Sequence, residues 1–219
     1  GHTIPAHLSP ERRAGLESGL RDAVRALGIR TGAAKGDVFL TPDGAVVIGE
    51  LAARLSGGYM SGWTYPYATG IPLVEKAMRL ALGESPGALQ PLLERAAAER
   101  AVVSIPGKVR RVHGETAVRR MDGVAELFLR CPPGDAVTMP RNNTEKVANV
   151  IAGGDSREEA SRAAEAAAAT LFVELEPGIE ETLAYLLGAR SASPGEDAGR
   201  RDHGQFDQYP DFFPSSAFR

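Results

Sequence analysis

The chain has 219 residues, of which 43% are hydrophobic and 24% are charged, and its formal net charge is −3. This length is enough for one large or two small hydrophobic cores, and the charge gives no overall field that would favour nucleic acid. No apolar run is long enough to span a bilayer, so we expect neither a nucleic-acid nor a membrane partner. The single cysteine, Cys131, excludes an internal disulfide and suits a reducing compartment, which predicts a cytoplasmic protein.

The first predicted element is a helix that begins after Ser9. Ser9 suits the N-cap position, Pro10 suits the first turn, and Gly28 suits the end of the helix. Leucine and valine residues recur at positions 16, 20, 24 and 27, which places them on one face.

A β-hairpin is predicted next, from strands at 35–42 and 45–50 joined by a two-residue turn at Asp43-Gly44. Asp-Gly suits a type I′ turn. In the register that this turn sets, Phe39 faces Ile48 and Thr41 faces Val46. Asp37 then faces Glu50 on the same face, with Cβ atoms roughly 5 Å apart.

Two carboxylates in this position repel each other, so the arrangement favours a cation between them. Mg²⁺ is the usual partner of one or two carboxylates plus substrate phosphates, with Mn²⁺ as an alternative ion. Arg54 follows Glu50 and offers a planar fork for phosphate oxygens, and Ser56, Gly57 and Gly58 offer backbone amides that a ligand can approach closely. The alternative interpretation is that Asp37 and Glu50 are solvated edge-strand charges in a different register, with Arg54 paired to either one.

Beyond the hairpin, residues 56–70 are rich in glycine and aromatic side chains, which predicts an irregular loop. The loop is either a lid or substrate-contacting segment, or an aromatic-packed connection. Helices are then predicted at 72–82, with Leu73, Val74 and Met78 among its buried side chains, and at 88–100.

From residue 101 the pattern changes to short strands, predicted at 101–105, 108–112, 115–119, 124–131, 136–139, 147–152 and 172–175. Ser156 and Glu159 form a capping box for a helix, and 179–187 is a last helix. Five basic residues on two of the strands are either an anion site or, as the more usual case, the solvated face of a half-buried sheet: Lys108, Arg110, Arg111, Arg119 and Arg120.

The last segment, 189–219, is predicted to be a tail, because it is rich in serine, proline, glycine and charged residues. It also carries an aromatic group consisting of Phe206, Tyr209, Phe212, Phe213 and Phe218. Two alternatives follow: a mobile tail, or a segment that docks through these side chains on its own domain or on a partner.

The run from Gly36-Asp37 to Glu50-Leu51-Ala52-Ala53-Arg54-Leu55-Ser56-Gly57-Gly58 resembles the end of the catalytic domain of the ATP-grasp superfamily, in particular its carboxylate-amine ligases. In that superfamily an acidic residue on one strand and a Glu-x-Asn-x-Arg on the next hold Mg²⁺ and the nucleotide phosphates. The resemblance implies that Asp37 and Glu50 are metal ligands and that Arg54 is a catalytic phosphate clamp. This chain departs from the pattern at Ala52, where many members have the metal-binding Asn, and at Lys35, where some amino-acid ligases carry His.

The resemblance also implies the fold class, which is α+β. Residues 1–100 would be the distal half of the ATP-grasp domain, an antiparallel sheet with helices. Residues 101–188 would be a small, β-rich α+β C-terminal domain, followed by the tail at 189–219. We expect the nucleotide-gripping half of the catalytic domain to be missing from these 219 residues.

Two functions follow. In the first, the parent protein is an ATP- and Mg²⁺-dependent ligase that activates a carboxylate as an acylphosphate for attack by an amine or similar nucleophile. The isolated chain would then be an incomplete fragment without turnover of its own. In the second, the chain is a non-catalytic binding or assembly module. The expected partners are a nucleotide, a small carboxylate substrate, a chain that carries the N-terminal half, and a second copy of this chain.

Overall fold

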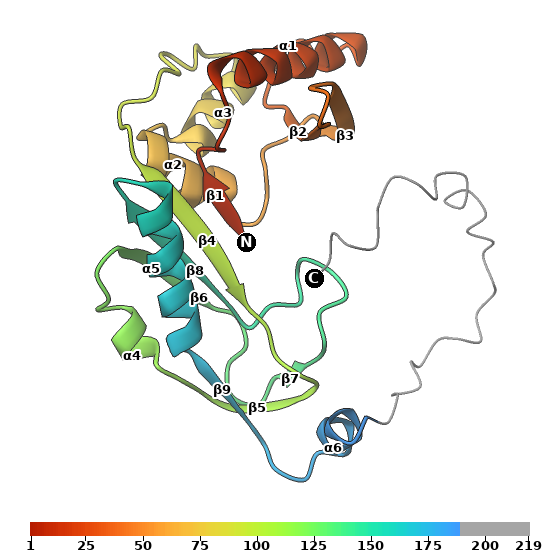
Figure 1. Cartoon of the computed structure of the whole chain (residues 1–219), viewed down its shortest axis with the longest axis vertical. Helices are drawn as coiled ribbons and strands as arrows, with labels where there is room; N and C mark the ends of the chain where they lie inside the picture. The colour runs from red at the N-terminus through yellow and green to blue at the C-terminus, as the bar shows by residue number, and fades with distance from the viewer. Residues whose placement is uncertain (189–219) are drawn as a thin grey trace, which may run out of the picture.

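The computed structural model describes residues 1–188, in which helices pack against antiparallel sheets (Figure 1). Every strand pairing in this part of the chain is antiparallel, so the predicted α+β class is confirmed. The predicted tail at 189–219 and its aromatic residues lie outside the described residues. The described helices include none that is both long enough and apolar enough to cross a bilayer.

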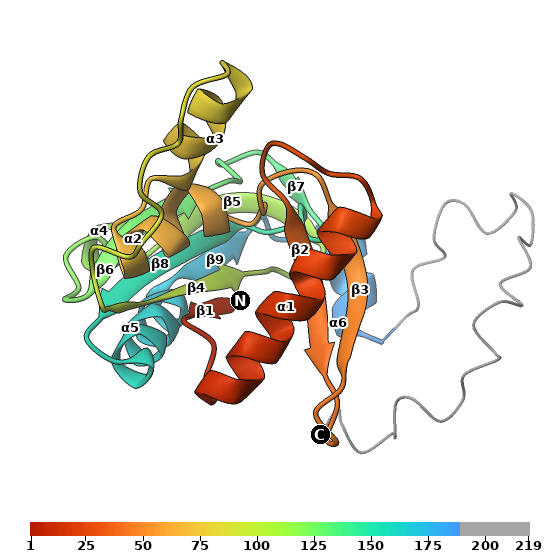
Figure 2. The same cartoon turned by 90° about the horizontal axis from the view of Figure 1, so that it is seen from above.

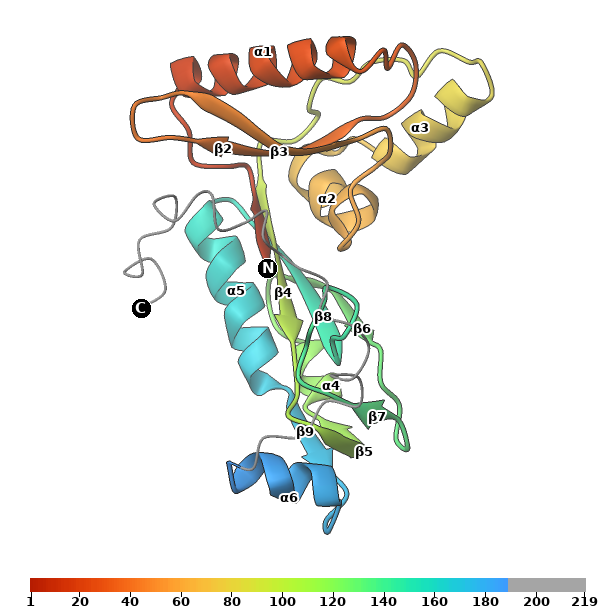
Figure 3. The ribbon, with the colours of Figure 1, turned by 90° about the vertical axis from the view of Figure 1, so that its right-hand side faces the viewer.

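The first region, called the hairpin region here, consists of helix α1 (Pro10–Ala26) and the hairpin of β2 (Lys35–Leu40) and β3 (Val46–Ala52). The α1 helix lies across the hairpin, as Figure 3 shows. The Ser9 hydroxyl accepts a hydrogen bond from the Arg12 amide at 3.3 Å, which confirms the predicted cap. Leu20 of α1 lies against Gly36 of β2, where a Cβ atom would collide with it. Glycine therefore allows the close approach of helix and hairpin.

The hairpin pairs Asp37 with Glu50, as predicted, but most of the predicted register toward the turn is wrong by one residue. The Thr41 carbonyl accepts a hydrogen bond from the Gly44 amide, and the Thr41 amide donates to the Ala45 carbonyl. The loop between the strands therefore has three residues, and Pro42 lies at the second position of the turn. This loop pairs Phe39 with Val47 rather than with Ile48. An irregularity next to Gly49 then restores the predicted pairing of Asp37 with Glu50.

The second region, called the sheet region, is a four-stranded sheet in the order β1, β4, β8, β6. Its strands are β1 (His2–Ile4), β4 (Ala96–Val102), β8 (Ala148–Gly154) and β6 (Val124–Leu129), and helix α5 (Arg157–Thr170) packs along β4 and β8 (Figure 1). The helix begins with the predicted capping box of Ser156 and Glu159. Small side chains let α5 approach the sheet closely, and the fully buried ones are Ala98, Ala152, Ala160 and Ala164.

The predicted helix at 88–100 is wrong, because residues 96–102 form β4 in the middle of the sheet. The run Ala96-Ala97-Ala98-Glu99-Arg100 has high helix propensity. Pairing with β1 on one side and β8 on the other outweighs that preference. The proposed domain boundary at residue 100 therefore falls inside β4, and the division into domains stays a prediction.

The segment at 56–70, predicted to be irregular, contains a π-helix η1 (Met60–Thr64) followed by α2 (Tyr65–Thr69), so that prediction is wrong. Both elements pack on β4. The next helix, α3 (Leu73–Ala81), projects away from the sheet (Figure 2). The prediction that Val74 and Met78 are buried is wrong, since they are 42% and 62% exposed.

The remaining elements lie at the far end of the sheet region. Strand β5 (Gly107–His113) pairs with β7 (Ala136–Val137) and with β9 (Phe172–Leu175), and α6 (Glu180–Leu186) follows. Residues Glu115–Val118 form a short helix, α4, instead of the predicted strand. Three of the five basic residues pair with neighbouring acids: Lys108 Nζ lies 3.2 Å from Glu176 Oε1, Arg110 Nη1 lies 3.1 Å from Glu174 Oε1, and Arg119 Nη2 lies 2.9 Å from Glu115 Oε1. This pairing supports the solvated-face interpretation.

Candidate functional site

The hairpin brings Asp37 and Glu50 together around the ammonium of Lys35, and Arg54, just after β3, lies beside Glu50. Lys35 Nζ lies 2.6 Å from Asp37 Oδ2 and 2.9 Å from Glu50 Oε1. Arg54 Nη2 lies 3.6 Å from the same Glu50 oxygen. The group that lies between the two carboxylates is the ammonium of a lysine in the same hairpin, and the prediction of a metal ion between them stays a prediction.

Lys35 differs from its partners in exposure. Its side chain is 16% exposed, whereas those of Asp37 and Glu50 are 56% and 53% exposed. The hydrogen bond to Asp37, followed by that to Glu50, raises the pKa of Lys35 above its usual value. The ammonium is therefore charged at every physiological pH.

The chemistry of the donor set fits one divalent ion. Asp37 and Glu50 offer hard oxygen ligands, and Lys35 bonds to one oxygen of each. Among residues 1–188, no group of three or more His, Cys, Asp and Glu side chains could hold a metal ion. An ion at this pair would therefore need oxygens from phosphate groups and water, which is how Mg²⁺ usually binds in nucleotide sites.

The segment after Arg54 connects the hairpin to the edge of the sheet. Arg54 donates from Nη1 to the Leu55 carbonyl at 3.0 Å. Gly58 has a φ of +61°, and its Cα faces the ring of His2 in β1. Gly57 has no atoms close to where a Cβ would be, so its backbone is open to a ligand. The predicted phosphate-binding segment, Ser56 to Gly58, thus runs from the carboxylate pair to β1.

A buried polar pair lies on the sheet face opposite α5, and the sequence did not reveal it. Glu99 of β4 and Asn149 of β8 are fully buried, and the Asn149 amide donates to Glu99 Oε1. Within the described residues, Glu99 Oε2 and Asn149 Oδ1 have no hydrogen-bond partner. The available signal was the pair of charged residues Glu99 and Arg100 inside the apolar run at 96–103, and the helix prediction hid its meaning.

Aromatic side chains cover the same face next to Asn149. Phe128 of β6 is the cross-strand neighbour of Asn149, and Tyr59 stacks on Phe128 with ring centroids 4.4 Å apart. Trp63 meets both rings edge-on, at 5.4 Å and 5.1 Å. Tyr67 donates to Glu126 Oε1 at 2.7 Å, and this bond raises the pKa of Tyr67. The segment after Gly58 therefore forms a packed aromatic cover.

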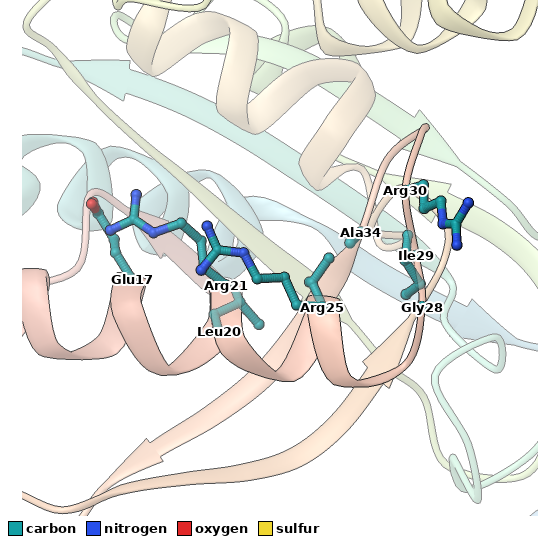
Figure 4. Close-up of a pocket in the computed structure, with 9 residues that line it drawn as sticks. Glu17, Leu20, Arg21, Arg25, Gly28, Ile29, Arg30 and Ala34 are labelled. Atoms are coloured by element: carbon teal, nitrogen blue, oxygen red, sulfur yellow. The ribbon is translucent and has the colours of Figure 1, made fainter.

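A separate groove of about 820 Å³ follows α1 and the loop after it (Figure 4). Its charged lining includes Arg21, Arg25 and Arg30, and its apolar lining includes Leu20 and Ile29. Arg25 is paired with Asp22 at 3.3 Å. The groove is a basic, partly apolar surface of the hairpin region.

Solved structures with this fold include a ligase, a synthetase and a carboxylase domain. An L-amino acid ligase from Bacillus licheniformis is 24% identical with a TM-score of 0.70, over 80% of this chain and 43% of that chain. A phosphoribosylglycinamide synthetase from Anaerococcus prevotii is 17% identical with a TM-score of 0.71, over 80% of this chain and 45% of that one.

A third solved structure with this fold contains bound ligands. The biotin carboxylase domain of a 2-oxoglutarate carboxylase from Hydrogenobacter thermophilus is 18% identical with a TM-score of 0.62, and it contains MgADP, ADP and bicarbonate. The match covers 79% of this chain and 38% of that one. The chain thus spans less than half the length of these three solved structures.

These structures have the fold that the resemblance of residues 36–58 to the ATP-grasp superfamily implies, so the resemblance is confirmed at the level of the fold. Within the chain, residues 100–176 match the family model of the L-amino acid ligase C-terminal domain 2. No curated protein matches the sequence.

Proposed function

We propose that this chain is the metal- and phosphate-binding part of an ATP- and Mg²⁺-dependent ligase that joins a carboxylate to an amine or a similar nucleophile. The observation that carries the proposal is the cross-strand pair of Asp37 and Glu50, with Arg54 at 3.6 Å from Glu50. The match of residues 100–176 to an L-amino acid ligase domain supports this class of substrate.

In this proposal Asp37 and Glu50 hold the divalent ion, which neutralises charge on the β- and γ-phosphates when it is bound. Arg54 donates to the oxygens of the γ-phosphoryl group and stabilises the charge that develops during its transfer. The open backbone of Gly57 lets phosphate approach the amides of the segment after Arg54.

The reaction has two steps. An oxygen of the substrate carboxylate attacks the γ-phosphorus, the bond to ADP breaks, and an acylphosphate forms. The amine then attacks the acyl carbon, phosphate leaves, and an amide results with loss of the amine proton. The protein needs to bind and orient the substrates and to neutralise the charge of the phosphates. No covalent protein nucleophile takes part.

The test is a thermal-shift titration of the chain with ATP, with and without Mg²⁺. A ligand at about 100 times its Kd adds about 2.7 kcal/mol to the free energy of unfolding. We expect a rise in Tm that requires Mg²⁺. Arg54→Ala should need about ten times more ATP, or more, for the same rise, because it loses charge-assisted hydrogen bonds to phosphate.

The matched control is Arg119→Ala. Arg119 lies at the far end of the sheet region and, like Arg54, forms an i,i+4 ion pair, with Glu115. Equal responses of Arg54→Ala and Arg119→Ala to MgATP would contradict the role of Arg54. A shift that is the same without Mg²⁺ would contradict the role of the carboxylate pair.

The second candidate function is an assembly module that completes a site with another chain. The groove along α1 favours it, because the groove combines three arginines with apolar side chains on the hairpin region. In that case ATP with Mg²⁺ would leave the Tm unchanged.

A further inference from the structure

Lys35 has a position in the carboxylate pair that the proposed function does not explain. Its ammonium bonds to Asp37 Oδ2 at 2.6 Å and to Glu50 Oε1 at 2.9 Å, so it lies between the two proposed metal ligands. A divalent ion held by these same two oxygens would have to replace the ammonium there.

The register explains how Lys35 reaches this position. Lys35 and Asp37 alternate on one face of β2, and their cross-strand partners on β3 are Ala52 and Glu50. Ala52 presents only a methyl group opposite Lys35. The lysine stem can therefore lie along the hairpin, which agrees with its exposed fraction of 16%, while the ammonium reaches both acids.

We propose that Lys35 is an internal cation of the metal site, which neutralises Asp37 and Glu50 in the absence of metal and competes with the divalent ion for them. This inference rests on the proposed function in taking the two carboxylates as the metal ligands. It adds that a bare divalent ion binds weakly to this chain, since binding displaces an ammonium that is already hydrogen-bonded to both acids.

The test measures binding of Mn²⁺ alone, by the electron paramagnetic resonance signal of the free ion, to the full chain and to Lys35→Met. Methionine keeps an unbranched apolar stem and removes the charge. We expect Lys35→Met to bind Mn²⁺ at least tenfold more tightly than the original chain. Lys35→Arg, which keeps the charge, should retain the weak binding.

Thermal unfolding of the same proteins gives a second measurement. In metal-free buffer Lys35→Met should unfold at a lower temperature, because Asp37 and Glu50 then face each other without a cation. Mn²⁺ should restore most of the loss in Lys35→Met and change the Tm of the original chain little. The control is Lys108→Met, which removes a lysine that pairs with Glu176 at the other end of the molecule.

Equal Mn²⁺ affinity of the original chain and Lys35→Met would overturn the inference about Lys35. The proposed function would then still be tested separately, by the ATP titration. Weaker Mn²⁺ binding by Lys35→Met would also overturn it, since Lys35 would then support the metal site. A Mn²⁺-independent loss of Tm would show a purely structural ion pair. If MgATP has no effect but Lys35→Met binds Mn²⁺ more tightly, the inference about Lys35 holds and the proposed function fails.

Discussion

The hairpin region and the sheet region are built in different ways. The sheet region has fully buried side chains between its strands and α5, including Val150 and Ala152 of β8 and Ala164 of α5. In the hairpin region α1 has no buried residue, and Phe39 and Val47 of the hairpin are 60% and 43% exposed. The difference implies that the sheet region supplies most of the stability, while the hairpin region carries the exposed charges of the proposed site.

The largest expected effect is that of opening the core of the sheet region. Ile151→Ala removes a fully buried side chain from β8, which should lower the free energy of unfolding by about 2–5 kcal/mol. Val47→Ala on the hairpin is the control and should cost much less, because Val47 is half-exposed. Urea unfolding measures both, and similar losses would contradict the division of roles between the two regions.

The buried pair of Glu99 and Asn149 gives a smaller effect of opposite sign. Glu99→Gln keeps an acceptor for the Asn149 amide and adds an N–H donor to a pair in which Asn149 Oδ1 has no partner in the described part of the chain. We expect the variant to be more stable by about 1 kcal/mol. Urea unfolding of Glu99→Gln and Glu99→Ala tests this, since Glu99→Ala should instead be destabilised by the cavity it leaves. A loss of stability in Glu99→Gln would show that the carboxylate has a partner of its own.

A change in the connection between the two regions should have an effect of similar size. Gly58→Ala places a Cβ at a φ of +61° next to the His2 ring, so it should cost about 1 kcal/mol. Gly57→Ala is the adjacent control, because no atom lies within 4 Å of its Cβ position. Thermal unfolding of the two variants should therefore differ, and equal Tm values would contradict the requirement for glycine at Gly58.

The carboxylate pair could be predicted from the sequence for a reason that is partly fortuitous. The predicted turn had two residues and the real one has three, so the expected partners of Phe39 and Thr41 were wrong. The irregularity at Gly49 compensates for the turn, and Asp37 still faces Glu50. No local sequence pattern predicts such a compensation, because it depends on the twist and pairing of the whole hairpin.

The buried pair of Glu99 and Asn149 in the sheet region could not be predicted, since it depends on pairing between distant strands. Glu99 lies in a segment with helical propensity, and only its place between β1 and β8 makes it a strand residue. The helix caps were predictable from local chemistry at Ser9 and at Ser156. The position of Lys35 between the two acids depends on the register of β2 and β3, so it also required the structure.

The most direct test of the proposed metal site is a crystal of the chain grown with ADP and Mn²⁺, measured at the manganese absorption edge. We expect an anomalous peak at about 2.1–2.3 Å from a carboxylate oxygen of Asp37 and of Glu50, with the β-phosphate completing the ligands. Asp37→Asn should remove or weaken the peak. A bound ADP with no peak at this pair, or a peak at other residues, would contradict the assignment of Asp37 and Glu50 as metal ligands.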